Sequence, residues 1–97
     1  MPAAHRLQDS CTGHGCWPSR SNAQASANVF VNGQGWHREG DAWQEHCCPA
    51  IPECHAGVLA QGSPSVFVNG LSAGRLGDPV SCGSTCATGS PNVFANG

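Results

Sequence analysis

The sequence predicts an all-β fold, a small pseudo-threefold cone of short β-hairpins that is closed between the N- and C-terminal ends. Three observations support this class: a strand-and-turn segment that occurs three times, a second repeated signature displaced along the chain, and a composition poor in large apolar residues. The strand-and-turn copies occupy residues 29–33, 66–70 and 93–97, and each runs from Val-Phe to Asn-Gly. A β-branched and aromatic run that ends in Asn-Gly is typical of a strand entering a type I′ turn, because both turn residues accept positive φ.

The second signature, an arginine followed three residues later by an aspartate, indicates how the repeats close. Copies follow the first two hairpin segments at residues 38–41 and 75–78, whereas the remaining copy lies at residues 6–9. The third hairpin is complete only if the two ends of the chain meet, which predicts a closed ring. The alternative is three unrelated Asn-Gly hairpins in an ordinary β domain. We expect a single domain over residues 1–97, with units at about 1–33, 34–70 and 71–97.

Composition favours turns and short strands for the segments between these copies. The 97 residues include 13 Gly and 7 Pro but only three Phe and three Trp, so helices should be nearly absent. A core this small needs a cross-link, such as a disulfide or a bound metal ion. In chain order we expect a return strand at residues 1–9, a Gly-rich loop at 11–16, an irregular surface loop at 17–24, a first hairpin at about 27–40, a long loop with an insertion at 42–57, a short strand at 58–60, a second hairpin at about 65–78, a loop at 79–86 and a final strand.

Charge and hydropathy exclude several classes of function. Charged residues make up 10% of the chain and the net charge is −2, so there is no basic face for nucleic acid and no polybasic segment for a membrane surface. No apolar run is long enough to span a bilayer, and the N-terminal residues lack the order of a signal peptide. We therefore expect the chain to be made in the cytoplasm, without a signal peptide.

Cysteine and histidine usage favours a metal site over a secreted disulfide framework. The chain contains seven Cys, an odd number, together with five His. When the units are aligned on their aspartates, His14 and His46 each lie five residues after one, and Cys82 lies four after the third. In a ring, equivalent loops converge, so these three side chains could meet at one ion. His55, from the longest loop, is the natural fourth ligand, and three imidazoles with one thiolate describe a closed structural zinc site.

Other assignments of the same residue types remain open. Cys54 stands beside His55 and could replace it, as could Cys86, and a four-thiolate site could use Cys11, Cys16, Cys82 and Cys86. Otherwise we expect the remaining cysteines to be small buried apolar residues near the tip, or to form one disulfide. His5 and His37 are equivalent to each other, but the third unit has Gly74 there, so we assign both to the surface or to an interface.

The repeated Arg and Asp residues are expected to be structural, with Asp accepting loop N–H groups and Arg pairing with a carboxylate. No nucleophile stands beside them, no Ser-His-Asp order is visible and no phosphate-cradling loop is present. We expect no catalytic residues and no enzyme activity.

Taken together, the motifs make the chain resemble the PAAR-repeat proteins. The resemblance rests on Gly-Ser-Pro-x-Val-Phe-x-Asn-Gly at residues 62–70 and 89–97, on Arg-x-Gly-Asp at 38–41 and 75–78, and on Cys-Thr-Gly-His-Gly at 11–15, and it covers essentially the whole chain. The chain departs from the family pattern at His5, which interrupts the Pro-Ala-Ala-Arg signature, and at Gln8, which replaces the Gly before Asp9.

The resemblance implies a function and partners. Members of this family are short β cones that cap the blunt end of a trimeric β-helical spike, either the VgrG-type spike of the type VI secretion system or the central spike of a contractile phage tail. It implies one structural zinc held by His14, His46, His55 and Cys82. It also implies one copy per spike trimer, transient contact with the target membrane as the spike pierces it, and toxic effector extensions in some members, of which this chain looks like the bare-tip form. The location implied is the tip of a phage tail spike or of a secreted spike.

Two further classes stay open on the sequence alone: a secreted disulfide-rich binding module, and a small zinc enzyme, for which this composition offers little to build a pocket. The sequence does not distinguish a phage tail from a bacterial secretion machine, although the Cys-Thr-Gly-His-Gly-Cys opening at residues 11–16 and the lack of an effector slightly favour a phage tail.

Overall fold

The computed structural model describes residues 1–51 and 53–95, and these contain six strands and no helix. The strands form three separate two-stranded antiparallel sheets. They pair as β1 (Phe30–Val31) with β2 (Gln34–Gly35), β3 (Ala42–Cys48) with β4 (Glu53–Val58), and β5 (Phe67–Val68) with β6 (Leu71–Ser72). The expected all-β class and the expected lack of helices are confirmed for the described residues, which accordingly hold no helix able to cross a membrane.

The Asn-Gly pairs form the predicted turns. Asn32 and Gly33 have φ values of 54° and 80°, and Asn69 and Gly70 have φ values of 55° and 78°. Positive φ at both central residues is the requirement of a type I′ turn, so the prediction is confirmed for two of the three copies. The third turn, at residues 96–97, lies outside the described residues. Each hairpin pairs over only two residues per strand, shorter than expected, because the flanking backbone pairs with other repeats.

Backbone hydrogen bonds join the three Arg-x-x-Asp copies in a cyclic order. The residues just before the three arginines are His5, His37 and Gly74. His5 N donates to Gly74 O at 3.0 Å, Gly74 N donates to His37 O at 2.7 Å, and His37 N donates to His5 O at 3.1 Å. The three copies therefore lie side by side around a common centre, although they are far apart in the sequence.

The two ends of the chain meet, as the displaced signature predicted. Ala4 N donates to Val93 O at 2.8 Å, and Ala95 N donates to Pro2 O at 3.0 Å. The first residues thus supply the strand partner of the third repeat.

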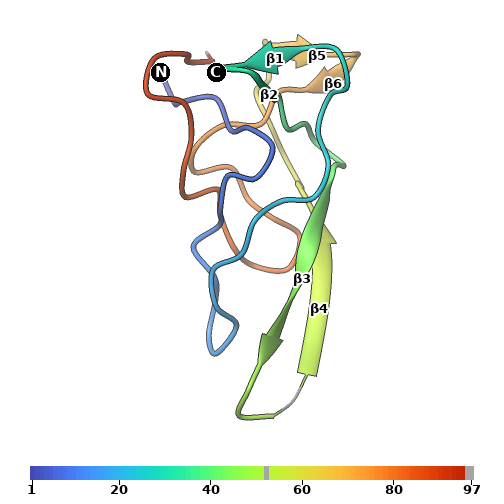
Figure 1. Cartoon of the computed structure of the whole chain (residues 1–97), viewed down its shortest axis with the longest axis vertical. Helices are drawn as coiled ribbons and strands as arrows, with labels where there is room; N and C mark the ends of the chain where they lie inside the picture. The colour runs from blue at the N-terminus through green and yellow to red at the C-terminus, as the bar shows by residue number, and fades with distance from the viewer. Residues whose placement is uncertain (52, 96–97) are drawn as a thin grey trace.

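The molecule is elongated, with principal extents of 39 × 24 × 21 Å. Figure 1 shows the N-terminus and the last described residues of the chain at the same end as β1, β2, β5 and β6, whereas the β3–β4 hairpin runs to the opposite end, where the molecule narrows. We refer to these as the broad end and the narrow end.

The β3–β4 hairpin corrects the sequence-based prediction of a long loop at residues 42–57. It is the longest strand pair in the described structure, and it contains a register shift between Trp43 and His46. Gln44 and Glu45 are both exposed at this bulge, and the buried face resumes at His46. Such a bulge interrupts the alternation of period two by which a strand is recognised in a sequence, so the pattern does not reveal β3.

A second correction concerns His5 and His37, which are fully buried and not at a surface or interface. Their rings lie 5.2 Å and 5.3 Å from the Trp43 ring, next to a core formed by Cys11, Leu59, Val80 and Cys86. The cyclic backbone bonds place the position before each arginine at the centre of the molecule. A Cβ atom on Gly74, the equivalent position of the third unit, would lie 2.6 Å from the carbonyl oxygen of His37 and 3.0 Å from the Leu59 side chain, so the close approach of the three segments requires glycine there.

The repeated Arg and Asp residues have the predicted structural role. Arg38 donates from Nε and Nη2 to the two carboxylate oxygens of Asp41 at 2.8 Å and 3.0 Å, and its backbone N donates to the same carboxylate at 3.0 Å. The pairs Arg6–Asp9 and Arg75–Asp78 repeat this arrangement. Each pair closes the turn that follows a repeat and leaves the carboxylate fully engaged.

Candidate metal centre

Four side chains from three parts of the chain converge in the narrower half of the molecule. They are the four that the sequence predicted as metal ligands: His14, His46, His55 and Cys82. One nitrogen from each imidazole and the Cys82 sulfur all lie within 4.8 Å of one another. His46 is buried and the other three are partly exposed. The structure thus brings together every residue of the predicted set.

Strand pairing positions two of the four. His46 on β3 and His55 on β4 are directly opposite each other in the strand register, and their Nε2 atoms are 2.6 Å apart. The bulge in β3 shifts the inward–outward alternation of the strand by one residue, so the His46 side chain faces inward. A ligand pair fixed by a sheet register is held more rigidly than one on separate loops.

A tight turn positions His14. His14 and Trp17 exchange two backbone hydrogen bonds of 3.0 Å and 2.9 Å. Gly13 precedes them with φ of +73°, and a Cβ atom there would lie 2.7 Å from the carbonyl oxygen of Trp17. Only glycine fits this position, so the Gly-His sequence is a requirement of the turn.

Cys82 lies in the short loop closed by the hydrogen bond from Val80 N to Ser84 O at 2.8 Å. Burial raises the pKa of the Cys82 thiol, but hydrogen bonds from Ser84 and from the Arg20 side chain outweigh it, so the net pKa is below the usual value. The loop therefore presents a sulfur with increased thiolate character to the three imidazoles.

The proton positions on the imidazoles favour a cation between them. His46 Nδ1 lies 2.8 Å from the carbonyl oxygen of Pro18, which can only accept, so Nδ1 carries the proton and Nε2 of the neutral ring carries a lone pair. The Nε2 atom of His14 lies 3.2 Å from that of His46 and 2.9 Å from that of His55. Burial lowers the pKa values of His14 and His46, which favours neutral rings. Converging lone pairs repel one another unless a proton or a metal ion lies between them.

The donor set fits zinc. The nitrogens of His14 and His46 are 3.2 Å apart, close to the roughly 3.3 Å expected between two nitrogen ligands of one tetrahedral zinc, and the other two separations, 2.9 Å and 2.6 Å, are shorter. Three imidazoles and one thiolate would fill all four positions, as in a structural site.

Trp17 packs against this group, a contact that the sequence analysis did not predict. Its ring stacks on His14 at 5.1 Å between centroids and lies 4.9 Å from the His55 ring. Its indole N–H donates to the carbonyl oxygen of Glu53 at 3.0 Å. The segment at residues 17–24, predicted as a surface loop, thus contributes to the site, and no periodicity or motif could have revealed this.

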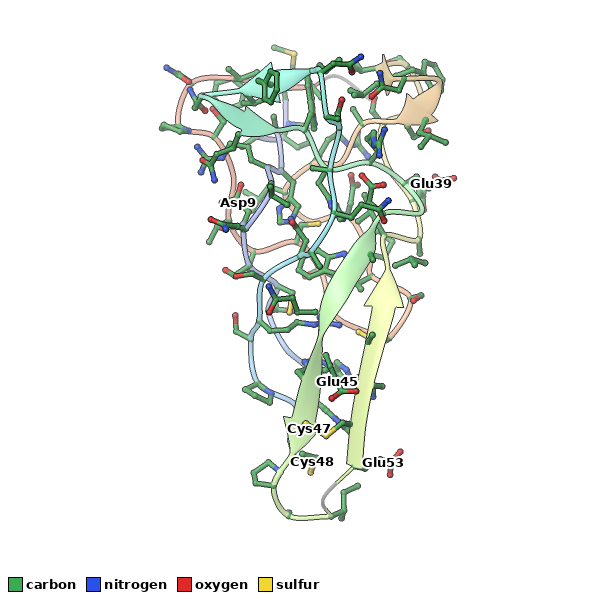
Figure 2. The ribbon with its side chains drawn as sticks, turned by 45° about the vertical axis from the view of Figure 1, so that its right-hand side comes forward. Asp9, Glu39, Glu45, Cys47, Cys48 and Glu53 are labelled. Atoms are coloured by element: carbon green, nitrogen blue, oxygen red, sulfur yellow. A yellow bond between two sulfur atoms is a disulfide. The ribbon has the colours of Figure 1, made fainter. Side chains whose placement is uncertain are left out.

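Two disulfides flank the group and correct the prediction for the cysteines. Cys16 is bonded to Cys48, and Cys47 is bonded to Cys54 across β3 and β4. Figure 2 shows Cys47 and Cys48 near the end of β3. The prediction of unpaired cysteines, or of one disulfide, is therefore wrong for these four, whereas Cys11 and Cys86 are free and buried, as expected. Two bonds form because Cys47 and Cys48 point to opposite faces of β3 and each meets a different partner.

The alternative ligand sets fail for the same reason. Cys16 and Cys54 are both used in disulfides, which removes the four-thiolate site and the replacement of His55 by Cys54. Glu45 lies near the Cys47–Cys54 pair, but the disulfide leaves that exposed group without thiolates. Cys86 belongs to the buried core cluster and is not one of the four converging side chains, and burial raises the pKa of its thiol.

Comparisons with known proteins agree with the architecture. The family model described as PAAR motif matches residues 12–88. The chain is 35% identical over 79 residues to the NAD(P)(+) glycohydrolase toxin Tse6 of Pseudomonas aeruginosa and, in another strain of that species, to the (p)ppApp synthetase toxin Tas1. Each match covers 76% of this chain and 18% of the toxin, so the chain spans about a fifth of the length of these relatives. A shorter match, 42% identical over 40 residues, covers 41% of this chain and 3% of the double-stranded DNA deaminase toxin A of Burkholderia cenocepacia.

Proposed function

The chain belongs to the PAAR-motif family, and on this premise we propose that it is the tip of a trimeric β-helical spike in a contractile injection machine. In this proposal the broad end binds the spike and the narrow end leads it through the target membrane. The protein acts as a structural part and not as an enzyme.

The observation that carries the proposal is a repeated aromatic residue at the broad end. Phe30, Phe67 and Phe94 occupy the same position in the three repeats, and their exposed fractions are 60%, 60% and 48%. The strands that carry the first two, β1 and β5, lie at the broad end (Figure 1). Three large apolar side chains exposed at one end of so small a domain are typical of an interaction site.

Hydrogen bonds between repeats hold this end in one shape. Ser26 donates to the turn residue Asn69 at 2.6 Å, and Ser90 donates to the turn residue Asn32 at 2.6 Å. Asn69 and Asn32 also accept from Arg38 and Arg6. The tip of each described turn is thereby bound to a neighbouring repeat, which reduces the conformational entropy lost on binding.

A pseudo-threefold cone suits a trimeric partner. Three units, at about residues 1–33, 34–70 and 71–97, would each face one chain of the spike, with one copy of this protein per trimer. The strand edges at the end of a β-helix expose unpaired backbone groups, and a cap covers them through strand addition and apolar contact.

The narrow end is proposed to hold one structural zinc through His14, His46, His55 and Cys82. Zinc binding would contribute directly to folding in a domain whose core is small. The metal and the two disulfides would together tie the β3–β4 hairpin to the loops beside it. Such cross-links resist deformation as the tip enters a membrane.

The relatives favour a bacterial toxin-delivery machine over a phage tail. Two of them are named as toxins of Pseudomonas aeruginosa, and the region they share with this chain is a minor part of each. We propose that the shared region places such proteins on a VgrG-type spike of the type VI secretion system. Disulfides are also consistent with a part that leaves the cytoplasm.

The proposal is tested by binding to a trimeric spike protein of the same genome. The triple variant Phe30→Asp/Phe67→Asp/Phe94→Asp should lose co-purification with the spike, because each exposed ring is replaced by a charge. Ile51→Asp is the matched control, since Ile51 is 54% exposed but lies in the β3–β4 turn at the narrow end. A native mass of one chain per three spike chains is expected for the wild type and for Ile51→Asp. Retained binding by a folded triple variant would contradict the proposed docking face.

A further inference from the structure

Arg20 connects the metal centre to the body of the protein. Its Nη2 group donates to the Cys82 sulfur at 3.3 Å, and its Nη1 group donates to the Cys11 sulfur at 3.0 Å. The third side of the guanidinium, Nε, donates to the carbonyl oxygen of Gln44 on β3 at 2.8 Å. One side chain therefore joins the β3 bulge to two cysteines that are 71 positions apart in the sequence.

These contacts set Arg20 apart from the other arginines. Arg6, Arg38 and Arg75 each form an ion pair with the aspartate three residues later. Within residues 1–51 and 53–95, Arg20 forms no ion pair with a carboxylate, and two of its three acceptors are sulfur atoms. Hydrogen bonds from a charged donor are stronger and more directional than neutral ones, so these sulfur contacts fix orientation.

The guanidinium itself is held in place. Its central carbon lies 5.1 Å from the centroid of the Trp43 ring, and Trp43 is buried in the core. The backbone oxygen of Arg20 accepts from Cys11 N at 3.0 Å, which fixes the segment that carries the side chain. A planar group stacked on a buried ring and bonded on three sides has little freedom to move.

Cys82 is the candidate ligand with the least support from its own surroundings. His46 and His55 are fixed by the register of β3 and β4, and His14 is fixed by its turn and by the Trp17 ring. Cys82 lies in a loop outside any strand, and its side chain can adopt three staggered rotamers about its single χ1 torsion. The Cys82 sulfur is reached by the hydrogen bond from Arg20 Nη2 at 3.3 Å and by a hydrogen bond from the Ser84 backbone, and it makes a longer contact of 3.8 Å to the Ser84 hydroxyl. Among these partners, Arg20 is the one that comes from outside the Cys82 loop.

We propose that Arg20 is the positioning residue of the metal centre, and that its guanidinium holds the Cys82 sulfur where it meets the three imidazoles. This inference rests on the proposed zinc site. Cys11 serves as the second acceptor that fixes the rotation of the guanidinium. Partners of this kind, one shell outside the ligands, orient the ligands and contribute to metal affinity.

Lysine cannot replace arginine in this role. An ammonium group is a point donor without a planar fork, so it cannot reach two sulfurs and the Gln44 carbonyl oxygen in fixed directions. The conservative variant Arg20→Lys keeps the charge and removes the geometry, which separates an electrostatic effect from a positioning effect.

The test is cobalt and zinc binding to the full chain. Cobalt bound to a thiolate gives a charge-transfer absorption band that reports the Cys82 sulfur, and competition with a chromophoric chelator gives the affinity. For Arg20→Gln and Arg20→Lys we expect zinc affinity to fall by about 10- to 100-fold, with a weaker cobalt–thiolate band. Arg38→Lys is the matched control, because it disturbs an arginine remote from the site, and its zinc affinity should stay within about twofold of wild type.

The outcomes separate this inference from the proposed function. If the wild-type chain binds neither metal, the zinc site itself fails and the inference fails with it. If the wild type binds zinc and both Arg20 variants match its affinity and its cobalt band, the inference alone is overturned. Should Arg20→Gln fail to fold, Cys11→Val removes only the second sulfur acceptor and should give an intermediate loss, while Cys11→Ser keeps an acceptor and should resemble wild type. Equal affinity for all three proteins would contradict the inference.

Discussion

His46 and His55 are direct partners in the β3–β4 register, and their Nε2 atoms approach to 2.6 Å, closer than either approaches His14. The next pair along the same strands is Cys47 with Cys54, which is covalently bonded. One ladder thus carries a candidate ligand pair and a cross-link in adjacent positions, so the geometry of the site depends on a register that a disulfide secures.

Metal removal is predicted to destabilise the protein. At a free zinc concentration of about 100 times the dissociation constant, binding adds about 2.7 kcal/mol, and for a domain of this size that corresponds to a rise of roughly 10–20 °C in the melting temperature. Chelation should reverse this rise in the wild type. His46→Ala/His55→Ala should bind less than one equivalent of zinc and show no change on chelation. Glu45→Gln, which changes an exposed neighbour, is the control, and a chelator response in the double variant would contradict the assignment.

Acid is predicted to destabilise the protein through His37. The ring is fully buried, and burial lowers its pKa from 6.5 to about 4, although its hydrogen bond to the Gln24 carbonyl oxygen opposes part of this shift. The unfolded chain then binds the proton more readily than the folded one. The contribution to stability is therefore complete above pH 6.5 and is lost as the pH falls from 6.5 towards 4.

The measurement is the free energy of unfolding in urea at pH 7 and at pH 5. The wild type should lose about 2 kcal/mol more than His37→Asn, whose amide keeps a donor near the Gln24 carbonyl oxygen. Protonation of the candidate metal ligands affects both proteins equally and cancels in this difference. Parallel pH profiles would show that His37 does not titrate as described.

Removal of a repeated aspartate is predicted to be costly. Asp78 accepts from the backbone N, Nε and Nη2 of Arg75, and the two side chains are only 7% and 10% exposed. Asp78→Ala leaves a buried guanidinium without its counterion and should lower the free energy of unfolding by about 3 kcal/mol. Glu39→Ala, at an exposed carboxylate, should change it by less than about 0.5 kcal/mol. Similar losses for the two variants in urea unfolding would contradict the structural role of the pair.

The two disulfides are predicted to contribute unequally. They close segments with sequence separations of 32 and 7 residues, so loop-closure entropy gives roughly 4 kcal/mol for Cys16–Cys48 and roughly 2 kcal/mol for Cys47–Cys54. Cys16→Ser/Cys48→Ser should therefore lower the unfolding free energy more than Cys47→Ser/Cys54→Ser. Peptide mapping without reduction should recover both bonds, and alkylation of the unfolded chain should label Cys11, Cys82 and Cys86. Labelling of more than these three would exclude the pairing.

The repeat architecture could be predicted because its signals are local. Asn-Gly requires positive φ at two consecutive residues, so the turns at Asn32 and Asn69 follow from the residue types alone. The meeting of the two ends could be predicted because the third Arg-x-x-Asp copy lies at residues 6–9, near the start of the chain, and not after the third hairpin segment. Three of the four converging side chains could be found because equivalent positions in a ring face the same centre, and His55 could be found because it lies in the longest segment between the hairpins.

The features that could not be predicted depend on contacts between repeats. The bulge at Gln44 and Glu45 places two exposed residues next to each other, so β3 lacks the regular alternation of apolar and polar residues that predicts a strand. The burial of His5 and His37 follows from the cyclic backbone bonds between the three repeats, which no single segment reveals. Arg20 carries no motif, and its sulfur contacts exist only because distant loops meet beside it.

The tripeptide at residues 46–48 has a consequence for changes in chain length. His46 and Cys48 face inward and Cys47 faces outward, so three consecutive positions hold a candidate metal ligand and one half of each of two disulfides. A single-residue deletion in β3 would exchange the two faces and misplace the ligand and both sulfurs at once. Point substitutions on the outer side of this hairpin should thus be far easier to accept, in evolution or in engineering, than the gain or loss of one amino acid.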